Sequence, residues 1–268
     1  MTGTYVHGYD PRENSRLRDQ AATLDALLHS DTFYPAGARV LEAGCGVGAQ
    51  TVILAAGSPD ALITSVDVSE ASVAQARAAV AAHGFTNVTV RQADLFNLPF
   101  PPASFDHVFV CFVLEHLRDP LAVLTSLKGM LKPNGTITVI EGDHGSTFFH
   151  PDSGLARRAI QCQEVLQAQG GGNALIGRTL YPLLTKAGFG AVDVSPRIVY
   201  ADDSRPDLAD GFTRKTFTAM IEGVRAPALA AKLMSAAEFD QGIADLYRTA
   251  EPGGVFCYTF FKARGVSP

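Results

Sequence analysis

Short runs of apolar residues alternate along this chain with longer segments in which apolar residues recur at helical spacing. The short runs predict strands over residues 39–42, 62–66, 88–91, 105–111 and 136–141. The longer segments predict helices over residues 49–56, 70–82 and 120–131, and an earlier helix that begins near Ser15. Because strands joined by helices pair in parallel, the pattern predicts an α/β fold with a doubly wound, mostly parallel sheet.

The regular alternation of predicted strands and helices ends after Glu141. Residues 150–187 and 206–250 have helical spacing, whereas residues 192–200 and 255–262 read as strands. Pro196 has no N–H to donate, so the first of these two strands should lie at a sheet edge. We expect a single domain over residues 1–268. Its predicted parts are an N-terminal lid arm and helix (1–36), a ligand-binding core (37–142), helical lid insertions around the edge strand (143–250) and a last strand (251–268).

Composition narrows the function classes. The 268 residues are 47% hydrophobic and carry a net charge of −5, which argues against a large basic face for nucleic acid or anionic membrane. No apolar run approaches the ~18–20 residues of a membrane span, and the polar start does not resemble a signal peptide. The four cysteines lie far apart, as expected for free thiols in a reducing compartment. We therefore expect a cytoplasmic protein without a metal site, because no compact set of metal ligands occurs.

The central motif is a glycine-rich turn, Glu42-Ala43-Gly44-Cys45-Gly46-Val47-Gly48, between a predicted strand and a predicted helix. Glycines let the backbone approach a ligand closely, and the start of the helix supplies N–H donors. The spacing Gly44-x-Gly46-x-x-Ala49 also satisfies the dinucleotide pattern, so a nicotinamide cofactor is one interpretation of this motif.

Three acidic residues favour a different cofactor. Glu42 lies two residues before the first glycine, where a carboxylate would face an amino-acid ammonium group. Asp67 closes the next strand, where a ribose diol would lie, and Asp94 closes the strand after that, where it could accept from an adenine amino group. Each acid alone is more often a helix cap or a turn residue, but their order at successive strand ends indicates a nucleoside-containing ligand.

With these motifs in place, residues 37–142 resemble the class I S-adenosylmethionine-dependent methyltransferases. The segments VLEAGCGVG, SVDVS, QADLFNLPF, SFDHVFVCFVLEHL and LKPNGTITVIEGD follow one another in the family's order. The resemblance implies a seven-stranded sheet whose last strand is antiparallel, S-adenosyl-L-methionine as cofactor and S-adenosyl-L-homocysteine as product. It also implies a cofactor site framed by Glu42, Gly44, Gly46, Gly48, Asp67, Val68, Asp94, Leu95 and Phe112.

The segments HGYDPRE and IEGDHGS and the C-terminal half are similar to a narrower branch, the Streptomyces enzymes that methylate C3 of indole in tryptophan-derived diketopiperazines and related alkaloids. This similarity implies a small-molecule acceptor and pyrroloindoline formation. Aromatic residues of the helical insertions suit a covered, apolar acceptor pocket. O- or N-methylation of another small metabolite, a nicotinamide-dependent reductase and a non-catalytic cofactor-binding protein are the alternatives. A homodimer is compatible with the sequence but not required by it.

Methylation of an indole carbon releases a proton, so the site needs a general base. His144 is the first candidate because it follows the fifth strand, at the carboxyl edge where open α/β sheets bind ligands; the alternative is a solvated turn. His116, just past the fourth strand, is the second candidate, or else a histidine at a helix start beside Glu115. In the family, an N-terminal arm often folds over the ligand, so Tyr9 and Glu13 could orient the base; otherwise they belong to a frayed terminus.

Overall fold

The computed structural model describes residues 11–268, with side chains described from Gln20 onward. Seven strands form one sheet in the order β3-β2-β1-β4-β5-β7-β6, and only β7 runs antiparallel to its neighbours. This confirms the predicted α/β fold with its seven-stranded, mostly parallel sheet. The strands are β1 (Arg39–Ala43), β2 (Leu62–Asp67), β3 (Val88–Gln92), β4 (Phe105–Cys111), β5 (Leu131–His150), β6 (Gly190–Ala201) and β7 (Val255–Val266).

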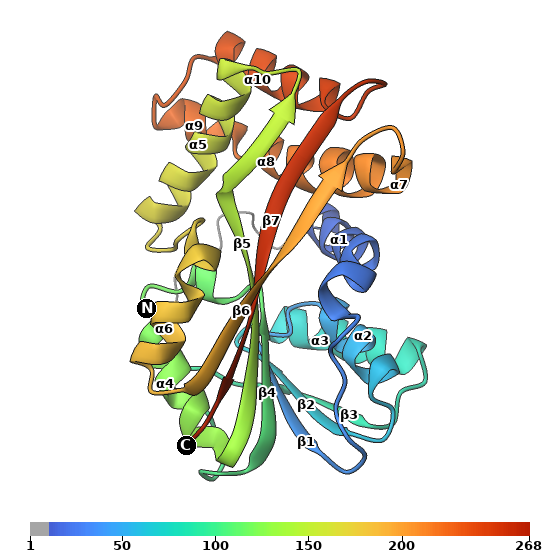
Figure 1. Ribbon diagram of the computed structural model, residues 1–268, viewed down its shortest axis with the longest axis vertical. Helices are drawn as coiled ribbons and strands as arrows, with labels where there is room; N and C mark the ends of the chain where they lie inside the picture. The colour runs from blue at the N-terminus through green and yellow to red at the C-terminus, as the bar shows by residue number, and fades with distance from the viewer. Residues whose placement is uncertain (1–10) are drawn as a thin grey trace.

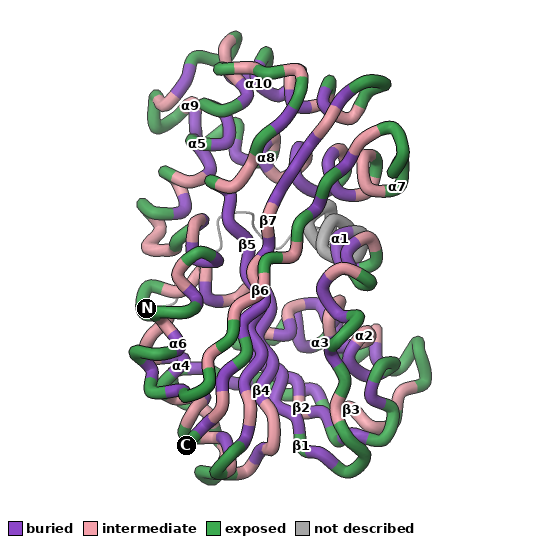
Figure 2. The backbone as a smooth tube through the Cα atoms, in the orientation of Figure 1, coloured by how far each residue is buried: buried purple, intermediate pink, exposed green. Residues whose placement is uncertain are grey.

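Helices cover both faces of the sheet (Figure 1). Helices α1 (Pro11–His29), α2 (Ala49–Gly57) and α3 (Glu70–Ala82) pack on one face, and α4 (Pro120–Met130) and α6 (Leu180–Lys186) pack on the other. Successive strand residues alternate between two buried clusters: Val40 and Phe109 lie in one, and Leu41 and Val110 in the other. The central strands are therefore buried on both sides over most of their length, where the tube is mainly purple (Figure 2).

Three strands continue far beyond the carboxyl ends of β1 and β4. The ladder between β4 and β5 ends at Cys111 and Ile140, but β5 then runs on beside β7 to His150. A set of helices packs on this extension: α5 (Gly154–Gln169), α7 (Pro206–Leu208), the π-helical segment η3 (Ala209–Thr218), α8 (Ala219–Gly223), α9 (Arg225–Ala230) and α10 (Ala236–Arg248). We call this part of the molecule the cap.

Two predicted boundaries are wrong. The apolar pattern predicts a fifth strand that ends at Glu141 and a helix from residue 150, but β5 continues to His150 and α5 begins at Gly154. The reason is that β7, a strand from the other end of the chain, offers a second pairing partner once β4 has ended. The first helix already includes Pro11, the first residue that the structure describes, instead of starting near Ser15.

The edge position predicted for the strand with Pro196 is confirmed, because β6 is the last strand of the sheet. Two short 3-10 turns complete the fold, η1 (Leu114–His116) after β4 and η2 (Ile176–Thr179) before α6. Within residues 11–268, no helix combines the length and the apolar character that crossing a membrane requires.

Candidate active site

The glycine-rich turn between β1 and α2 depends on its glycines for two different reasons. Gly44, Gly46 and Gly48 all have positive φ angles, of 79°, 51° and 84°. A Cβ on Gly44 would lie 2.5 Å from a methyl of Val113, and one on Gly48 would lie 2.9 Å from the backbone of Ala76. A Cβ on Gly46, in contrast, would meet no atom of the residues that the structure describes within 4 Å. The turn is therefore packed at both ends and open at its centre, as a turn that receives a ligand must be.

Glu42 lies directly beneath this turn and is 2% exposed. Its Oε2 accepts hydrogen bonds from Thr51 Oγ1 on α2 (2.7 Å) and from Ser65 Oγ on β2 (2.6 Å). Burial raises the pKa of Glu42 to about 7; the two hydroxyls oppose this rise and the charge of Asp67 adds to it. Bringing a cationic group to this carboxyl would favour its ionised form.

Asp67, the last residue of β2, is hydrogen-bonded to the backbone of Gly46 at the centre of the glycine-rich turn. Its Oδ2 accepts from the backbone N–H of Gly46 and its Oδ1 from that of Ser69, both at 2.9 Å. Each carboxylate oxygen has a second lone pair, and the side chain is only partly buried. Asp67 can therefore shape the turn and also accept from a ligand hydroxyl.

The other predicted cofactor residues lie at the same edge of the sheet in different environments. Val68 is 45% exposed and Asp94 is exposed, with its Oδ1 accepting from the N–H of Phe96. Leu95 is only 8% exposed and packs in the core, while the neighbouring Phe96 is 51% exposed. Val68, Asp94 and Phe96 are therefore accessible just past the ends of β2 and β3, as residues that contact a ligand must be.

Phe112 immediately follows β4 and has a φ of 57°, which is unusual for a bulky side chain. Its ring lies 5.4 Å from that of Phe260, centroid to centroid. The left-handed residue turns the chain so that Val113 packs against Gly44. Backbone strain of this kind is typical of functional sites.

These features fit the cofactor that the resemblance implies. The open space over Gly46 gives room for the ligand, Glu42 offers a carboxyl to an ammonium group, and Asp67 offers lone pairs to a ribose. The assignment of these residues to the cofactor remains a prediction.

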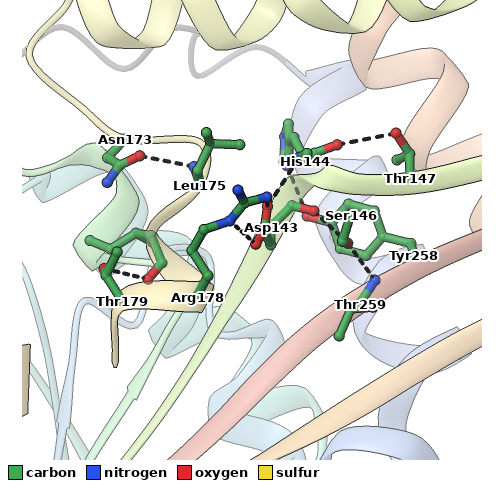
Figure 3. A network of polar contacts seen from close by, with 12 residues as sticks. Asp143, His144, Ser146, Thr147, Asn173, Leu175, Arg178, Thr179, Tyr258 and Thr259 are labelled. Atoms are coloured by element: carbon green, nitrogen blue, oxygen red, sulfur yellow. Dashed lines mark hydrogen bonds and ion pairs between the residues drawn. The ribbon is translucent and has the colours of Figure 1, made fainter. Parts of the chain in front are cut away.

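His144 lies on the extension of β5, above the carboxyl edge of the sheet. It is 6% exposed, so the alternative of a solvated turn is wrong. Its Nδ1 lies 2.8 Å from the hydroxyl of Tyr258 on β7 (Figure 3). Its backbone N–H donates to Ala174 O at 3.0 Å. The imidazole also contacts the ring of Phe217 on η3, at 5.9 Å between centroids. The chain thus places a histidine in an aromatic environment beside a phenolic hydroxyl.

Tyr258 was not identified from the sequence. It is fully buried among Phe212, Phe217 and Phe260, at centroid distances of 4.7 to 5.5 Å. Burial raises the pKa of Tyr258 well above its usual range, with a further contribution from the charge of Glu115, so the hydroxyl keeps its proton. The only sequence signal was a tyrosine on the buried side of an aromatic strand, where its hydroxyl needs a partner.

Asp143 and Arg178 form the other polar contact beside His144. Arg178 Nε and Nη2 donate to the two carboxylate oxygens of Asp143, at 2.6 and 2.7 Å (Figure 3). Asp143 is 2% exposed, whereas the Arg178 side chain is 49% exposed. This two-pronged ion pair fastens η2 to β5 next to the histidine.

The remaining predicted catalytic residues are not brought together with His144 by the described side chains. His116 is the last residue of η1, not the start of a helix, and its Nε2 lies 3.7 Å from a carboxylate oxygen of Glu115, the neighbour that the alternative interpretation named. Glu13 lies near the start of α1, but its side chain is outside the described residues, and so is Tyr9 altogether. Among the side chains described, no three His, Cys, Asp or Glu residues gather as a metal site.

Comparison with known proteins identifies the family to which the chain is similar. The family described as "Methyltransferase domain" matches residues 41–139. An uncharacterized 37.1 kDa protein in a transposon of Streptomyces fradiae is 31% identical over 244 residues, which cover 87% of this chain and 68% of that protein. The 27-O-demethylrifamycin SV methyltransferase of Amycolatopsis mediterranei is 31% identical over 134 residues, or 50% of this chain and 49% of that enzyme. The chain thus spans about two thirds of the first relative and about half of the second.

Solved structures share the fold at low sequence identity. The phosphoethanolamine N-methyltransferase 2 of Haemonchus contortus, in complex with S-adenosyl-L-methionine, has a TM-score of 0.57 and 19% identity. The alignment covers 93% of this chain and 52% of that one.

Proposed function

This chain belongs to the class I S-adenosylmethionine-dependent methyltransferases, and we propose that it methylates C3 of an indole in a small tryptophan-derived cyclodipeptide. It is an enzyme that uses S-adenosyl-L-methionine and acts on a small molecule, so the nicotinamide interpretation of the glycine turn is abandoned.

The observation that carries the proposal is the His144–Tyr258 pair inside an aromatic environment, above the carboxyl edge of the sheet. Rings of Phe212, Phe217 and Phe260 surround Tyr258, and the cap helices cover this region. Such a site favours a flat, apolar acceptor that needs one proton removed, and it suits an indole better than a polymer or a strongly charged metabolite.

When bound, the cofactor would supply an electrophilic methyl group, whose bond to sulfur breaks with the electron pair left on the sulfur, so that the sulfonium becomes a neutral thioether. The indole contributes the C2–C3 electron pair that forms the new carbon–carbon bond, and its ring nitrogen becomes an iminium. One proton must then leave, either from the ring nitrogen or, if the cyclodipeptide amide nitrogen closes on C2, from that amide. The chain must hold the acceptor in line with the methyl group and take up this proton.

We propose that His144 accepts the proton that leaves the acceptor. A neutral imidazole accepts at one nitrogen while the other carries hydrogen, and the Tyr258 oxygen is placed to accept from Nδ1 so that Nε2 serves as the base. The ion pair between the buried Asp143 and the half-exposed Arg178 holds the flanking backbone. Glu13 and Tyr9 remain proposed members of this relay, and His116 is the second candidate for the base.

The remaining predictions belong to the same proposal. Glu42, Gly44, Gly46, Gly48, Asp67, Val68, Asp94, Leu95 and Phe112 frame the cofactor. The chain acts as one domain whose cap, together with the N-terminal arm, covers the acceptor. A cytoplasmic location and a homodimer stay predictions.

The test is to incubate the protein with S-adenosyl-L-methionine carrying a ¹³C methyl group and with a panel of tryptophan cyclodipeptides. Mass spectrometry should show the gain of one methyl, and NMR should place it on a quaternary carbon at C3. His144→Ala should lose about 10²–10⁴-fold in turnover while its cofactor affinity stays at the wild-type value. A methyl found on oxygen or nitrogen would refute C3-methylation, and full turnover in His144→Ala would remove the histidine from the relay.

A further inference from the structure

Glu141 is a buried carboxyl group that the proposed chemistry does not use. It is the first residue of β5 beyond the ladder with β4, and it is 0% exposed. One oxygen, Oε1, accepts from the backbone N–H groups of Val113 (2.9 Å) and Leu114 (2.7 Å). Its Oε2 is buried as well. A carboxyl group in such a place needs a reason, because its burial is costly.

These two bonds hold the chain where it leaves β4. The N–H of Phe112 donates to Ile140 O at 2.9 Å, so Ile140 and Glu141 together receive three successive amides, those of Phe112, Val113 and Leu114. Phe112 is the residue with the left-handed backbone, a conformation that persists only where its surroundings enforce it. The hydrogen bonds from Val113 and Leu114 to the Glu141 carboxyl help to hold Phe112 in this conformation.

The bend of the chain at Phe112 also affects the packing of the glycine-rich turn. It brings the side chain of Val113 so close to Gly44 that a Cβ on the glycine would lie 2.5 Å from Val113 Cγ2. Val113 therefore forms the wall against which the first glycine packs. A carboxyl on β5 thus acts on the cofactor turn through two backbone amides and one side chain.

The cap is attached to the same short turn. Gln167 on α5 donates from Nε2 to Glu115 O and to Glu115 Oε2, both at 3.0 Å, and the N–H of Asn173 donates to Glu115 O at 2.7 Å. Glu115 lies next to Leu114 within η1. The η1 turn is therefore held from β5 on one side and from the cap on the other.

We infer that Glu141 is a positioning residue for the cofactor site: its carboxyl fixes the backbone of residues 112–114 and thereby sets Val113 against Gly44. Burial, together with repulsion from Glu115, raises the pKa of Glu141 well above its usual range, which is consistent with a neutral carboxylic acid whose carbonyl oxygen accepts the two amides. A glutamine has the same shape and the same acceptor, so it should replace Glu141, whereas an apolar residue should not.

The experiment compares Glu141→Gln with Glu141→Leu by calorimetric titration of S-adenosyl-L-homocysteine, without any acceptor. The glutamine variant should bind within about threefold of wild type. The leucine variant should bind about 10-fold or more weakly, the factor that corresponds to roughly one lost hydrogen bond. Glu164→Leu makes the same chemical change on α5 and should leave the affinity unchanged. Urea unfolding of each variant separates affinity from stability.

Three outcomes overturn the inference. Wild-type affinity in a folded Glu141→Leu protein would show that the carboxyl is only structural. Equal weakening in the glutamine and leucine variants would show that its charge matters instead of its acceptor. If the leucine variant does not fold, Glu141→Asp, which draws the carboxyl back by one methylene, must weaken binding, and wild-type affinity there would refute the proposal. Because no acceptor is present, the result is independent of the indole assignment.

Discussion

The buried carboxyl of Glu42 predicts an unusual dependence of stability on pH. The raised pKa of Glu42, about 7 compared with an ordinary value of 4.5, means that the folded chain holds a proton here that the unfolded chain releases. This group therefore stabilises the fold fully below about pH 4.5, and the contribution is lost as pH rises toward and through 7. The difference of about 2.5 pH units corresponds to about 3 kcal/mol at 1.36 kcal/mol per unit.

Glu42→Gln tests this reasoning with little change of shape. The glutamine oxygen can still accept from the hydroxyls of Thr51 and Ser65, and the group no longer ionises. Urea unfolding of the two proteins at pH 5 and pH 8.5 gives four free energies of unfolding. We compare the free energy of unfolding of the variant with that of wild type at each pH. The difference, variant minus wild type, should be about 2 to 3 kcal/mol larger at pH 8.5 than at pH 5.

The control is Glu70→Gln on α3, where the carboxyl is exposed. It should leave the difference between the two pH values close to that of wild type. If Glu42→Gln and wild type lose stability in parallel over this range, the buried carboxyl is not protonated in the folded chain, and the argument from its burial is wrong.

Three further predictions concern other parts of the molecule. Asp67→Ala should weaken S-adenosyl-L-methionine binding by roughly 1.5–3 kcal/mol, the range for a charge-assisted hydrogen bond, and unchanged calorimetric affinity would remove Asp67 from the site. Tyr258→Phe keeps the ring but deletes the hydroxyl 2.8 Å from His144, so turnover should fall about 10-fold or more at unchanged cofactor affinity; an unaltered turnover number with the true acceptor would contradict the pairing. Lys262→Met removes a buried ammonium that donates to Leu28 O and Asp31, and urea unfolding should show a loss of about 1–3 kcal/mol, whereas equal stability would mean that the end of α1 needs no such anchor.

The arrangement of β1 to β4 and of the glycine-rich turn can be predicted from local sequence pattern alone. The strands and helices of this part are short, their apolar spacing is regular, and the glycine turn and the acids stand at strand ends, so local pattern and chain order suffice to place them. The carboxyl ends of parallel strands meet at one edge, which brings Glu42 and Asp67 to the same turn without any knowledge of distant contacts.

The extension of β5 and the contacts beside His144 and Phe112 depend on the tertiary structure. Nothing near Glu141 indicates that β5 continues, because its partner there is β7, which lies more than a hundred residues further along the chain. The same pairing places Tyr258 against His144, 114 residues apart, and the bend at Phe112 depends on a carboxyl 28 residues beyond Val113. Side-chain spacing reports the environment of a residue but not the identity of its partner. Contacts between distant strands are therefore fixed only when the whole sheet has formed.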